Sequence, residues 1–319
     1  MRFSIKKVVF YFWAFALLPA VSIAEESGAW KFLPPTPTAR TEVAAVNHQD
    51  KLYLIGGFTP DGVTGQVEVY DPQSGGWSKA APLPRPLHHT TAVSAQGKIY
   101  VVGGFSSVTW TPVNTVYAYD ASQNKWTQQA SMPTERGALA AGVIDGQIYA
   151  VGGALKKLFG LRNSNAHEVY NPETDNWKTL APIPTSRDHL TLSTADGLLY
   201  AIGGRVNVNY NQNLNANEAY DPKTNQWKTL APLPTARSGI TSQTITGKIY
   251  VFGGESGEGT FNENEAYDPK TNQWTAMPPM PKSCHGLASA VVNGAIHLLN
   301  GGPRPGGGSS TYHQVFTPQ

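Results

Sequence analysis

Short apolar runs recur along the chain, and each ends at a pair of glycines. Leu52–Ile55, Ile99–Val102 and Ile249–Phe252 are three of these runs. They are rich in β-branched and aromatic residues and are bounded by glycine, a pattern that predicts buried β-strands. The glycine pairs begin at Gly56, Gly103, Gly152, Gly203, Gly253 and Gly301, with successive separations of 47, 49, 51, 50 and 48 residues. The chain therefore contains six repeats of similar length.

A second pattern follows each glycine pair except the last: a tyrosine and a tryptophan seven positions apart. The pairs are Tyr70 and Trp77, Tyr119 and Trp126, Tyr170 and Trp177, Tyr220 and Trp227, and Tyr267 and Trp274. A turn such as Asp221–Asn225 separates the two aromatic residues, since its proline fixes φ and its asparagine tolerates the left-handed region. Asp145-Gly146 and Asn293-Gly294 mark another hairpin turn before the glycine pairs. Each repeat is predicted to be a four-stranded antiparallel meander, with strands a to d.

These three features, the glycine pair, the spaced tyrosine and tryptophan and the repeat length, resemble the kelch family over residues 29–319. In that family such repeats form the blades of β-propellers. The resemblance implies an all-β fold: a six-bladed β-propeller in which each repeat is one four-stranded blade. Blades need neighbours, because no single blade buries both of its faces.

The two ends of the repeat region complement each other. Residues 29–34 resemble a strand d such as 226–231, but no strands a to c precede them. Phe316-Thr317-Pro318 occupies the position of the Tyr-Asp-Pro of other repeats, and no tryptophan follows it. The sequence therefore predicts that the N-terminal strand closes the last blade and covers sheet edges that would otherwise be exposed.

The first 24 residues are typical of a signal peptide. Three basic residues precede an apolar stretch over residues 8–21, and Ala24 ends a cleavage motif of small residues. We therefore expect an exported protein, periplasmic or secreted, with a mature propeller over residues 25–319. No membrane association is expected after cleavage, and an uncleaved anchor is the alternative.

Without that segment the chain carries 21 Lys and Arg against 22 Asp and Glu, a formal charge of −1. Nothing in this balance indicates the basic face that binds nucleic acid. Cys284 is the only cysteine, so no intrachain disulfide can form. We expect a monomer that is stabilised by burial and by closure of the ring.

In a meander of this kind the b–c and d–a loops share one face of the disc. The b–c loops vary in length and composition, as ligand-binding loops tend to do, and the two longest span residues 154–167 and 205–217. Trp110 lies outside the repeat pattern in another b–c loop. His167, His297 and His313 fall on strands and are expected to pack within the blades.

The start of strand a opens on the same face and carries most of the candidate ligand-binding residues. Four repeats have arginine there, and the other two have Leu87 and Cys284. These arginines have a structural alternative, since they could bond loop carbonyls or pair with acids of neighbouring blades. The full candidate set is Arg40, Glu42, His88, His89, Arg136, Arg187, Asp188, His189, Arg205, Arg237 and His285.

The kelch resemblance implies that this channel mouth is the contact surface and that arginines there, including Arg205 after its glycine pair, hold acidic ligands. The other repeats carry Phe58, Phe105, Ala154, Glu255 and Pro303 at that position. Two function classes remain open. One is a binding scaffold for an anionic or carbohydrate small molecule or a protein segment. The other is a sugar epimerase or mutarotase similar to N-acetylneuraminate epimerase, with acid–base groups drawn from the same set.

No cofactor is expected and no metal site is predicted. Several imidazoles could converge at one rim, but they belong to different repeats, so their spacing is not diagnostic of a metal site. A copper–radical site like that of galactose oxidase would need Cys284 as its only cysteine, and the remaining tyrosine and histidine ligands are not recognisable.

Overall fold

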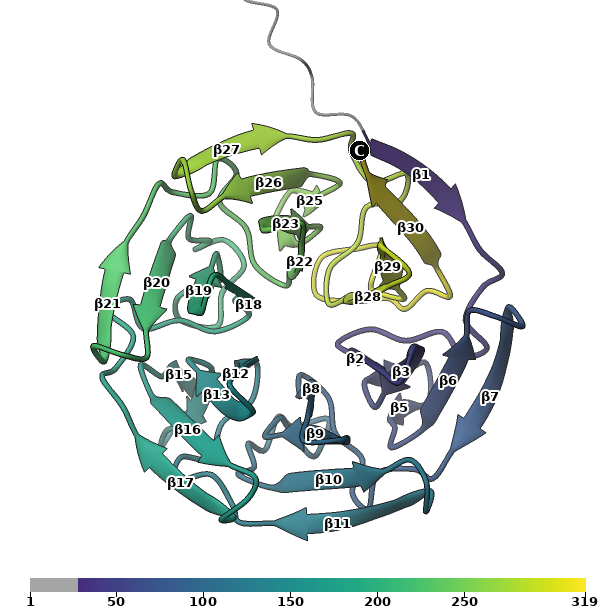
Figure 1. Cartoon of the computed structure of the whole chain (residues 1–319), viewed down its shortest axis with the longest axis horizontal. Helices are drawn as coiled ribbons and strands as arrows, with labels where there is room; N and C mark the ends of the chain where they lie inside the picture. Colours follow the sequence, from purple (N-terminus) through teal and green to yellow (C-terminus); the bar gives the residue numbers. More distant parts are fainter. Residues whose placement is uncertain (1–27) are drawn as a thin grey trace, which may run out of the picture.

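The computed structural model describes residues 28–319, and it arranges them as a ring of blades around a central axis (Figure 1). Within this range the chain forms six four-stranded antiparallel sheets and no helix. The predicted six-bladed all-β propeller is therefore confirmed. The predicted signal peptide, residues 1–24, lies outside the described residues. Within the described part, no helix is long and apolar enough to cross a membrane.

The innermost strand of each blade lines the axial channel, and the second strand forms the first layer of the core. The innermost strands, a, are β2 (Ala44–His48), β8 (Thr91–Ala95), β12 (Ala140–Ile144), β18 (Thr191–Ala195), β22 (Thr241–Ile245) and β28 (Ala288–Val292). The b strands are β3 (Lys51–Ile55), β9 (Lys98–Val102), β13 (Gln147–Val151), β19 (Leu198–Ile202), β23 (Lys248–Phe252) and β29 (Ala295–Leu299). The b strands are the apolar runs of the sequence, and they are buried between neighbouring blades.

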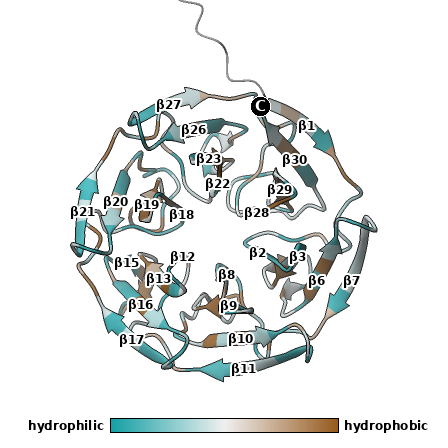
Figure 2. Cartoon of the chain, viewed as in Figure 1, coloured by the Kyte–Doolittle hydropathy of each residue, from teal (hydrophilic) through white to brown (hydrophobic). Residues whose placement is uncertain are grey.

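The two outer strands complete each blade. The c strands are β6 (Val67–Asp71), β10 (Val116–Asp120), β16 (His167–Asn171), β20 (Asn217–Asp221), β26 (Asn264–Asp268) and β30 (His313–Pro318). The d strands are β7 (Gly76–Ala80), β11 (Lys125–Gln129), β17 (Asn176–Thr179), β21 (Gln226–Thr229), β27 (Gln273–Ala276) and β1 (Gly28–Phe32). Figure 2 shows the gradient that results, from apolar b strands to largely hydrophilic d strands at the rim.

Three b–c loops contain short hairpins of their own. They are β4 (Phe58–Thr59) with β5 (Gly62–Val63), β14 (Ala154–Lys156) with β15 (Leu161–Asn163), and β24 (Glu255–Ser256) with β25 (Gly259–Thr260). Each hairpin begins directly after a glycine pair. The irregular loops of the sequence are thus ordered, and they rise around one mouth of the channel.

The N-terminal strand closes the ring as predicted. β1 pairs antiparallel with β30, with Gly28 opposite Pro318 and Trp30 opposite Phe316. The Trp30 indole also donates to the backbone oxygen of Pro278 at 2.9 Å, in the connection that follows β27 of the preceding blade. One short strand therefore joins the two ends of the chain and ties the last blade to its neighbour.

The repeated tyrosine and tryptophan are architectural. Tyr70 and Trp77 lie opposite each other on adjacent strands, and the equivalent pairs in later blades do the same. From the second blade on, the indole N–H donates to a backbone oxygen of the preceding blade, as Trp126 does to Ala81 at 2.8 Å. Each of these four tryptophans thus connects its own blade to the preceding one.

The glycine pairs sit where blades meet, and the last pair is shifted by one residue from the sequence prediction. Gly57 has φ of 94° and donates to the Leu87 oxygen of the next blade at 2.8 Å. In the last blade the equivalent of Gly57 is Gly301, which has φ of 99° and donates its N–H to the Arg40 oxygen. Asn300 therefore occupies the position that the first glycine of the pair has in the other blades. The position after the pair is therefore Gly302, not Pro303.

Candidate functional site

The four arginines at the start of strand a are buried in ion pairs. Arg40 pairs with Glu68 at 2.6 Å and Arg136 with Glu168 at 2.6 Å; Arg187 pairs with Glu218, and Arg237 with Glu265. All four arginine side chains are fully covered. The acidic partners lie on strand c of the same blade and not on neighbouring blades. The arginines also donate to backbone oxygens, as Arg40 does to Gly56 at 3.2 Å, which agrees with the other part of the structural alternative. These guanidiniums are therefore closed to a ligand at the mouth.

The six blades support this structural role. Where the arginine is replaced by Leu87, the glutamate position of the same blade holds Tyr117, and where it is replaced by Cys284, that position holds Gln314. Both members of the pair change together. This is expected for two buried charges, because either one left alone would be costly.

Two residues beyond each arginine position lies a residue that faces the axis, and we call these six positions the inner ring. They are Glu42, His89, Ala138, His189, Gly239 and Gly286. The backbone N–H of each donates to the oxygen of the preceding member at 2.7–3.1 Å, and Glu42 closes the circle by donating to Gly286. All six have positive φ, between 48° and 66°. A closed circle of main-chain hydrogen bonds thus fixes the positions of these Cα atoms.

Positive φ favours glycine, which stands at two of the six inner-ring positions. Glu42, His89 and His189 hold the same conformation with long polar side chains, which strains their backbone by about 1–2 kcal/mol each. Backbone strain of this kind concentrates at functional sites. Gly286 even makes room for its neighbour, since a Cβ there would lie 2.5 Å from the Glu42 carboxyl carbon.

The inner ring supplies a test of this strain. Ala138 has φ of 53° and carries no polar group, so Ala138→Gly relieves the strain and removes one buried methyl group. We expect the free energy of unfolding to rise by at most about 1 kcal/mol, because the lost methyl contacts and the more flexible unfolded chain offset part of the relief; urea denaturation measures it. Gly239→Ala, at an equivalent position, should lower it. A stable Gly239→Ala variant and an unchanged Ala138→Gly variant would show that the circle tolerates side chains without strain.

A second set of polar residues surrounds the inner ring at the mouth. Arg205 donates to Glu255 at 2.7 Å, to the Nε2 atom of His189 at 2.7 Å and to Asp188 at 3.2 Å. The Nε2 atom of His285 lies 3.5 Å from Glu42 and 3.6 Å from Glu255. Arg205 therefore links two adjacent blades, since Asp188 and His189 belong to its own blade and Glu255 to the next.

Hydrogen bonds fix which ring nitrogen carries the proton in each neutral imidazole. His88 Nε2 donates to the Ser107 oxygen at 3.0 Å, so its Nδ1 accepts from His89 Nδ1 at 2.6 Å. His189 Nδ1 donates to Asp188 at 2.5 Å. In both His89 and His189 the unprotonated nitrogen is therefore Nε2, and in His89 this atom lies 3.1 Å from a carboxylate oxygen of Glu42.

Burial dominates the electrostatics of this cluster. It raises the pKa of Glu42 to about 8, aided by the negative charge of Glu255 and opposed by Arg205. Burial also lowers the pKa of His89 well below its usual value, and the neighbouring histidines lower it further. The pKa of His189 is lowered by burial and by Arg205. At neutral pH the inner-ring imidazoles are therefore neutral. The Nε2 lone pair of His189 accepts from Arg205, whereas that of His89 has no hydrogen-bond donor among residues 28–319.

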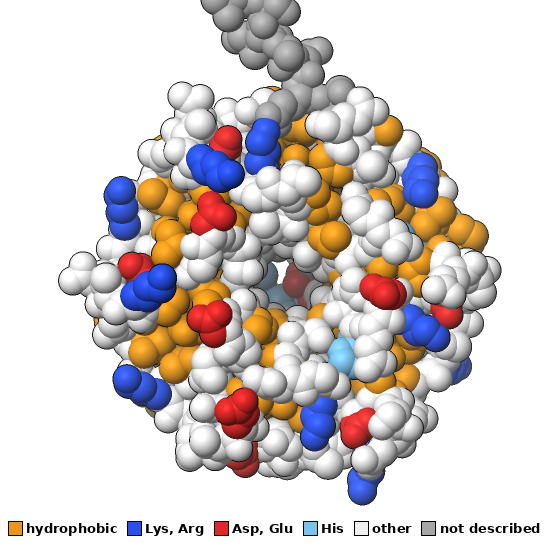
Figure 3. All heavy atoms as spheres, viewed as in Figure 1, with side chains coloured by type: hydrophobic (Ala, Val, Ile, Leu, Met, Phe, Trp, Pro, Cys, Tyr) orange, Lys and Arg blue, Asp and Glu red, His pale blue; other side chains and the backbone are white. Residues whose placement is uncertain are grey.

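Above this polar floor lies a cavity of about 400 Å³. Its walls are mainly apolar and aromatic, formed by Phe58, Trp110, Leu161, Val208 and Tyr210. Below the floor the axis continues as a narrower space of about 90 Å³, which Glu42 and His89 also line. Figure 3 shows the central opening of the disc, with histidine and acidic side chains in its depth. The inner ring thus stands at a constriction between the mouth and the axial channel.

The structure divides the sequence-predicted candidates into two groups. Six of them converge at the floor, with His88 directly behind His89, and the four arginines of strand a do not belong to the cavity. The converging residues are Glu42, His89, Asp188, His189, Arg205 and His285. His167, His297 and His313 are buried within the blades, as predicted.

Comparison with known proteins identifies the family. A model described as the KLHDC2/KLHL20/DRC7 Kelch-repeats domain matches residues 25–183 and 138–316. The chain belongs to the kelch-repeat family. The solved structure of YjhT superposes on this kelch propeller with a TM-score of 0.78 and 17% identity, covering 90% of this chain and 99% of that one. At this identity the likeness shows the fold alone. Comparison with curated protein sequences gave no match.

One polar residue of the kelch mouth was not among the sequence candidates. Glu255 is buried, pairs with Arg205 and accepts from the Gly306 N–H at 2.6 Å. The sequence did contain a sign of this residue: when the repeats are superposed, Glu255 occupies the same position after its glycine pair as Arg205 does. Opposite charges at equivalent positions of adjacent blades could have indicated this pair.

Proposed function

We propose that the channel mouth binds a small uncharged carbohydrate. The observation that carries the proposal is the cavity of about 400 Å³, with aromatic walls and a floor rich in hydrogen-bond acceptors. The flat faces of Trp110 and Tyr210 suit the apolar face of a sugar ring. Carboxylate oxygens of Glu42 and Glu255 and imidazole lone pairs suit its hydroxyl groups. A cavity of this size accepts one or a few sugar units.

The charges at the floor favour a neutral ligand over an anionic one. Arg205 already has three partners, Asp188, His189 and Glu255, so little of its donor capacity is left for a ligand carboxylate. An anion in the cavity would also face the carboxyl groups of Glu42 and Glu255. Of the two classes of small molecule that the sequence suggested, the geometry therefore supports the carbohydrate.

One observation favours a second candidate, a sugar epimerase or mutarotase. The Glu42 carboxyl group and the Nε2 atom of His89 lie 3.1 Å apart at the cavity floor. A proton donor and a proton acceptor this close could both reach the anomeric oxygens of one bound sugar. This chemistry would use the same pocket, so binding of a sugar is the first step to establish.

A sugar-binding screen tests the proposal. Neutral monosaccharides and disaccharides should bind the purified protein in isothermal titration calorimetry, whereas carboxylated sugars should bind more weakly. Trp110→Ala should weaken binding by about 10-fold, since an aromatic contact contributes about 0.5–1.5 kcal/mol beyond area burial. The matched control is Phe159→Ala, because that aromatic side chain is 82% exposed and does not line the cavity.

Two results would contradict the proposal: selective binding of anionic sugars, or unchanged affinity in Trp110→Ala. For the second candidate, the rate of anomer interconversion of any bound sugar is followed by NMR. Interconversion accelerated by the parent protein and abolished in Glu42→Gln supports the enzyme. Sugar binding without faster anomer interconversion supports a binding scaffold that has no epimerase or mutarotase activity.

A further inference from the structure

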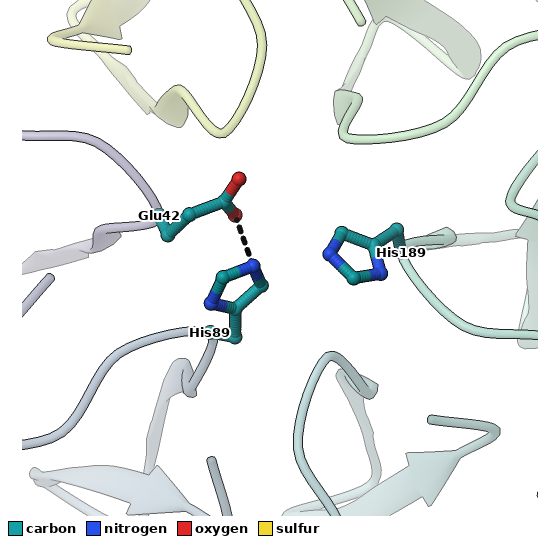
Figure 4. A group of neighbouring side chains, drawn as sticks. All are labelled: Glu42, His89 and His189. Carbon is teal, nitrogen blue, oxygen red and sulfur yellow. Dashed lines mark ion pairs between the residues drawn. The ribbon is translucent and has the colours of Figure 1, made fainter. Parts of the chain in front are cut away.

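Three side chains of the inner ring converge on one point of the axis (Figure 4). Glu42, His89 and His189 come from three blades, and their ligand-type atoms all lie within 4.8 Å of one another. The rings of His89 and His189 stand edge to face with centroids 4.8 Å apart. Two imidazole nitrogens and one carboxylate in this arrangement are a donor set that binds divalent transition metals.

His89 provides an independent observation. Its side chain is 2% exposed, and its Nε2 atom has no hydrogen-bond partner among residues 28–319. The Ser107 oxygen and His88 fix the proton on the far nitrogen, so a bare lone pair faces Glu42 Oε2 at 3.1 Å. Two acceptor atoms at this distance need a proton or a cation between them. Two ligands of a tetrahedral Zn²⁺ ion stand about 3.3 Å apart, close to this separation.

The two histidines also have the outer partners that metal-binding histidines usually have. The other ring nitrogen of a metal ligand normally donates to a carboxylate, a backbone oxygen or a similar acceptor, which orients the ring. His189 Nδ1 donates to the Asp188 carboxylate, and His89 Nδ1 donates to His88, which is itself held by the Ser107 oxygen. Both rings are thus oriented with Nε2 toward the axis.

The charges around this point call for a cation. Two carboxylates, those of Asp188 and Glu255, pair with the single guanidinium of Arg205, and the Glu42 carboxyl group beside them adds a third negative charge when it coordinates a cation. A divalent ion would offset this excess. Arg205 donates to His189 Nε2 at 2.7 Å, so the ion must replace that hydrogen bond, while Arg205 retains both of its carboxylate partners.

We propose that Glu42, His89 and His189 form a three-ligand site for a divalent transition metal, with Zn²⁺ as the representative ion. The strained backbone at all three positions, where Gly or Ala serves in the other three blades, supports selection for the side chains. Glu42 and His89 also line the mouth cavity, so the fourth coordination position faces a prospective ligand. The proposal concerns the metal alone and does not depend on the carbohydrate.

Metal titration of the purified full-chain protein tests the site. After treatment with a chelator and dialysis, isothermal titration with ZnCl₂ should show one Zn²⁺ per chain with Kd of about 1 μM or tighter, whereas Mg²⁺ and Ca²⁺ should not bind. His89→Ala and His189→Ala should each weaken Zn²⁺ binding by about 100-fold or more, and His88→Phe, which removes only the outer partner, by about 10–100-fold. Co²⁺ should give visible d–d bands that are lost in both alanine variants.

The matched control is His48→Gln, which changes another buried histidine at the far end of β2 and should leave Zn²⁺ affinity unchanged. Circular dichroism identifies any variant that fails to fold, and Glu42→Gln, which keeps the shape of the side chain, then serves in its place. The absence of saturable Zn²⁺ binding to the folded parent would overturn the proposal. Binding that survives unchanged in both folded alanine variants would overturn it as well, and would leave a hydrogen-bonded network with a shared proton at the axis.

Discussion

Deleting residues 28–35 should abolish the soluble, cooperatively folded state. The deletion removes β1 and exposes the outer edge of β30, whose backbone groups on that side would then be unpaired. It also removes Trp30, which packs on Phe316 with ring centroids 5.0 Å apart. Truncating a fully buried tryptophan typically costs about 3–5 kcal/mol; Trp30 is partly buried, so its own share is smaller, and loss of the strand adds to it. Size-exclusion chromatography and thermal unfolding measure the outcome, with aggregation as the expected result.

A permuted chain is the matched control for this deletion. Gly28 lies opposite Pro318, so residues 28–35 can be attached after Gln319 through a short turn, as c and d strands are joined in the other five blades. The permuted chain should be soluble and should unfold at a temperature close to that of the parent. A soluble deletion variant with the parent's melting temperature would show that β1 does not close the ring.

The fold could be predicted because each blade is specified by local sequence. The apolar b strands, the turns between c and d, and the paired Tyr70 and Trp77 all act within about 50 residues. Closure was also predictable, since β1 carries the tryptophan that β30 lacks. The shift of the last glycine pair was not, because Asn300 takes a conformation that the sequence pattern reserves for glycine.

The candidate site was predicted only in part, because its geometry depends on which way neighbouring side chains turn. Arg187, Asp188 and His189 are consecutive, yet the first enters a buried ion pair within its blade and the third faces the axis. From the sequence, all three side chains were expected at the channel mouth. Their different directions follow from the circle of main-chain hydrogen bonds, which sets the positive φ of His189 and turns its side chain toward the centre.

Arg136→Met should be one of the most destabilising single substitutions in the protein. It leaves Glu168 buried beside Thr134, without its guanidinium partner. Removing one member of a buried ion pair costs about 3–5 kcal/mol, because the remaining charge is uncompensated. We expect a loss of this size in the free energy of unfolding, measured by urea denaturation with an unchanged dependence on denaturant concentration.

The double variant Arg136→Met with Glu168→Gln should recover at least about 2 kcal/mol of that loss, since replacing both members of a buried pair by neutral side chains is often close to neutral. Two blades of the chain already have uncharged residues at both positions: Leu87 with Tyr117, and Cys284 with Gln314. Glu168→Gln retains the side-chain oxygen that accepts from Thr134. If the double variant is as unstable as the two single losses added together, the arginine does more than neutralise the glutamate. Its bond to the Ala150 oxygen at 2.9 Å would then be the main source of its stabilising effect.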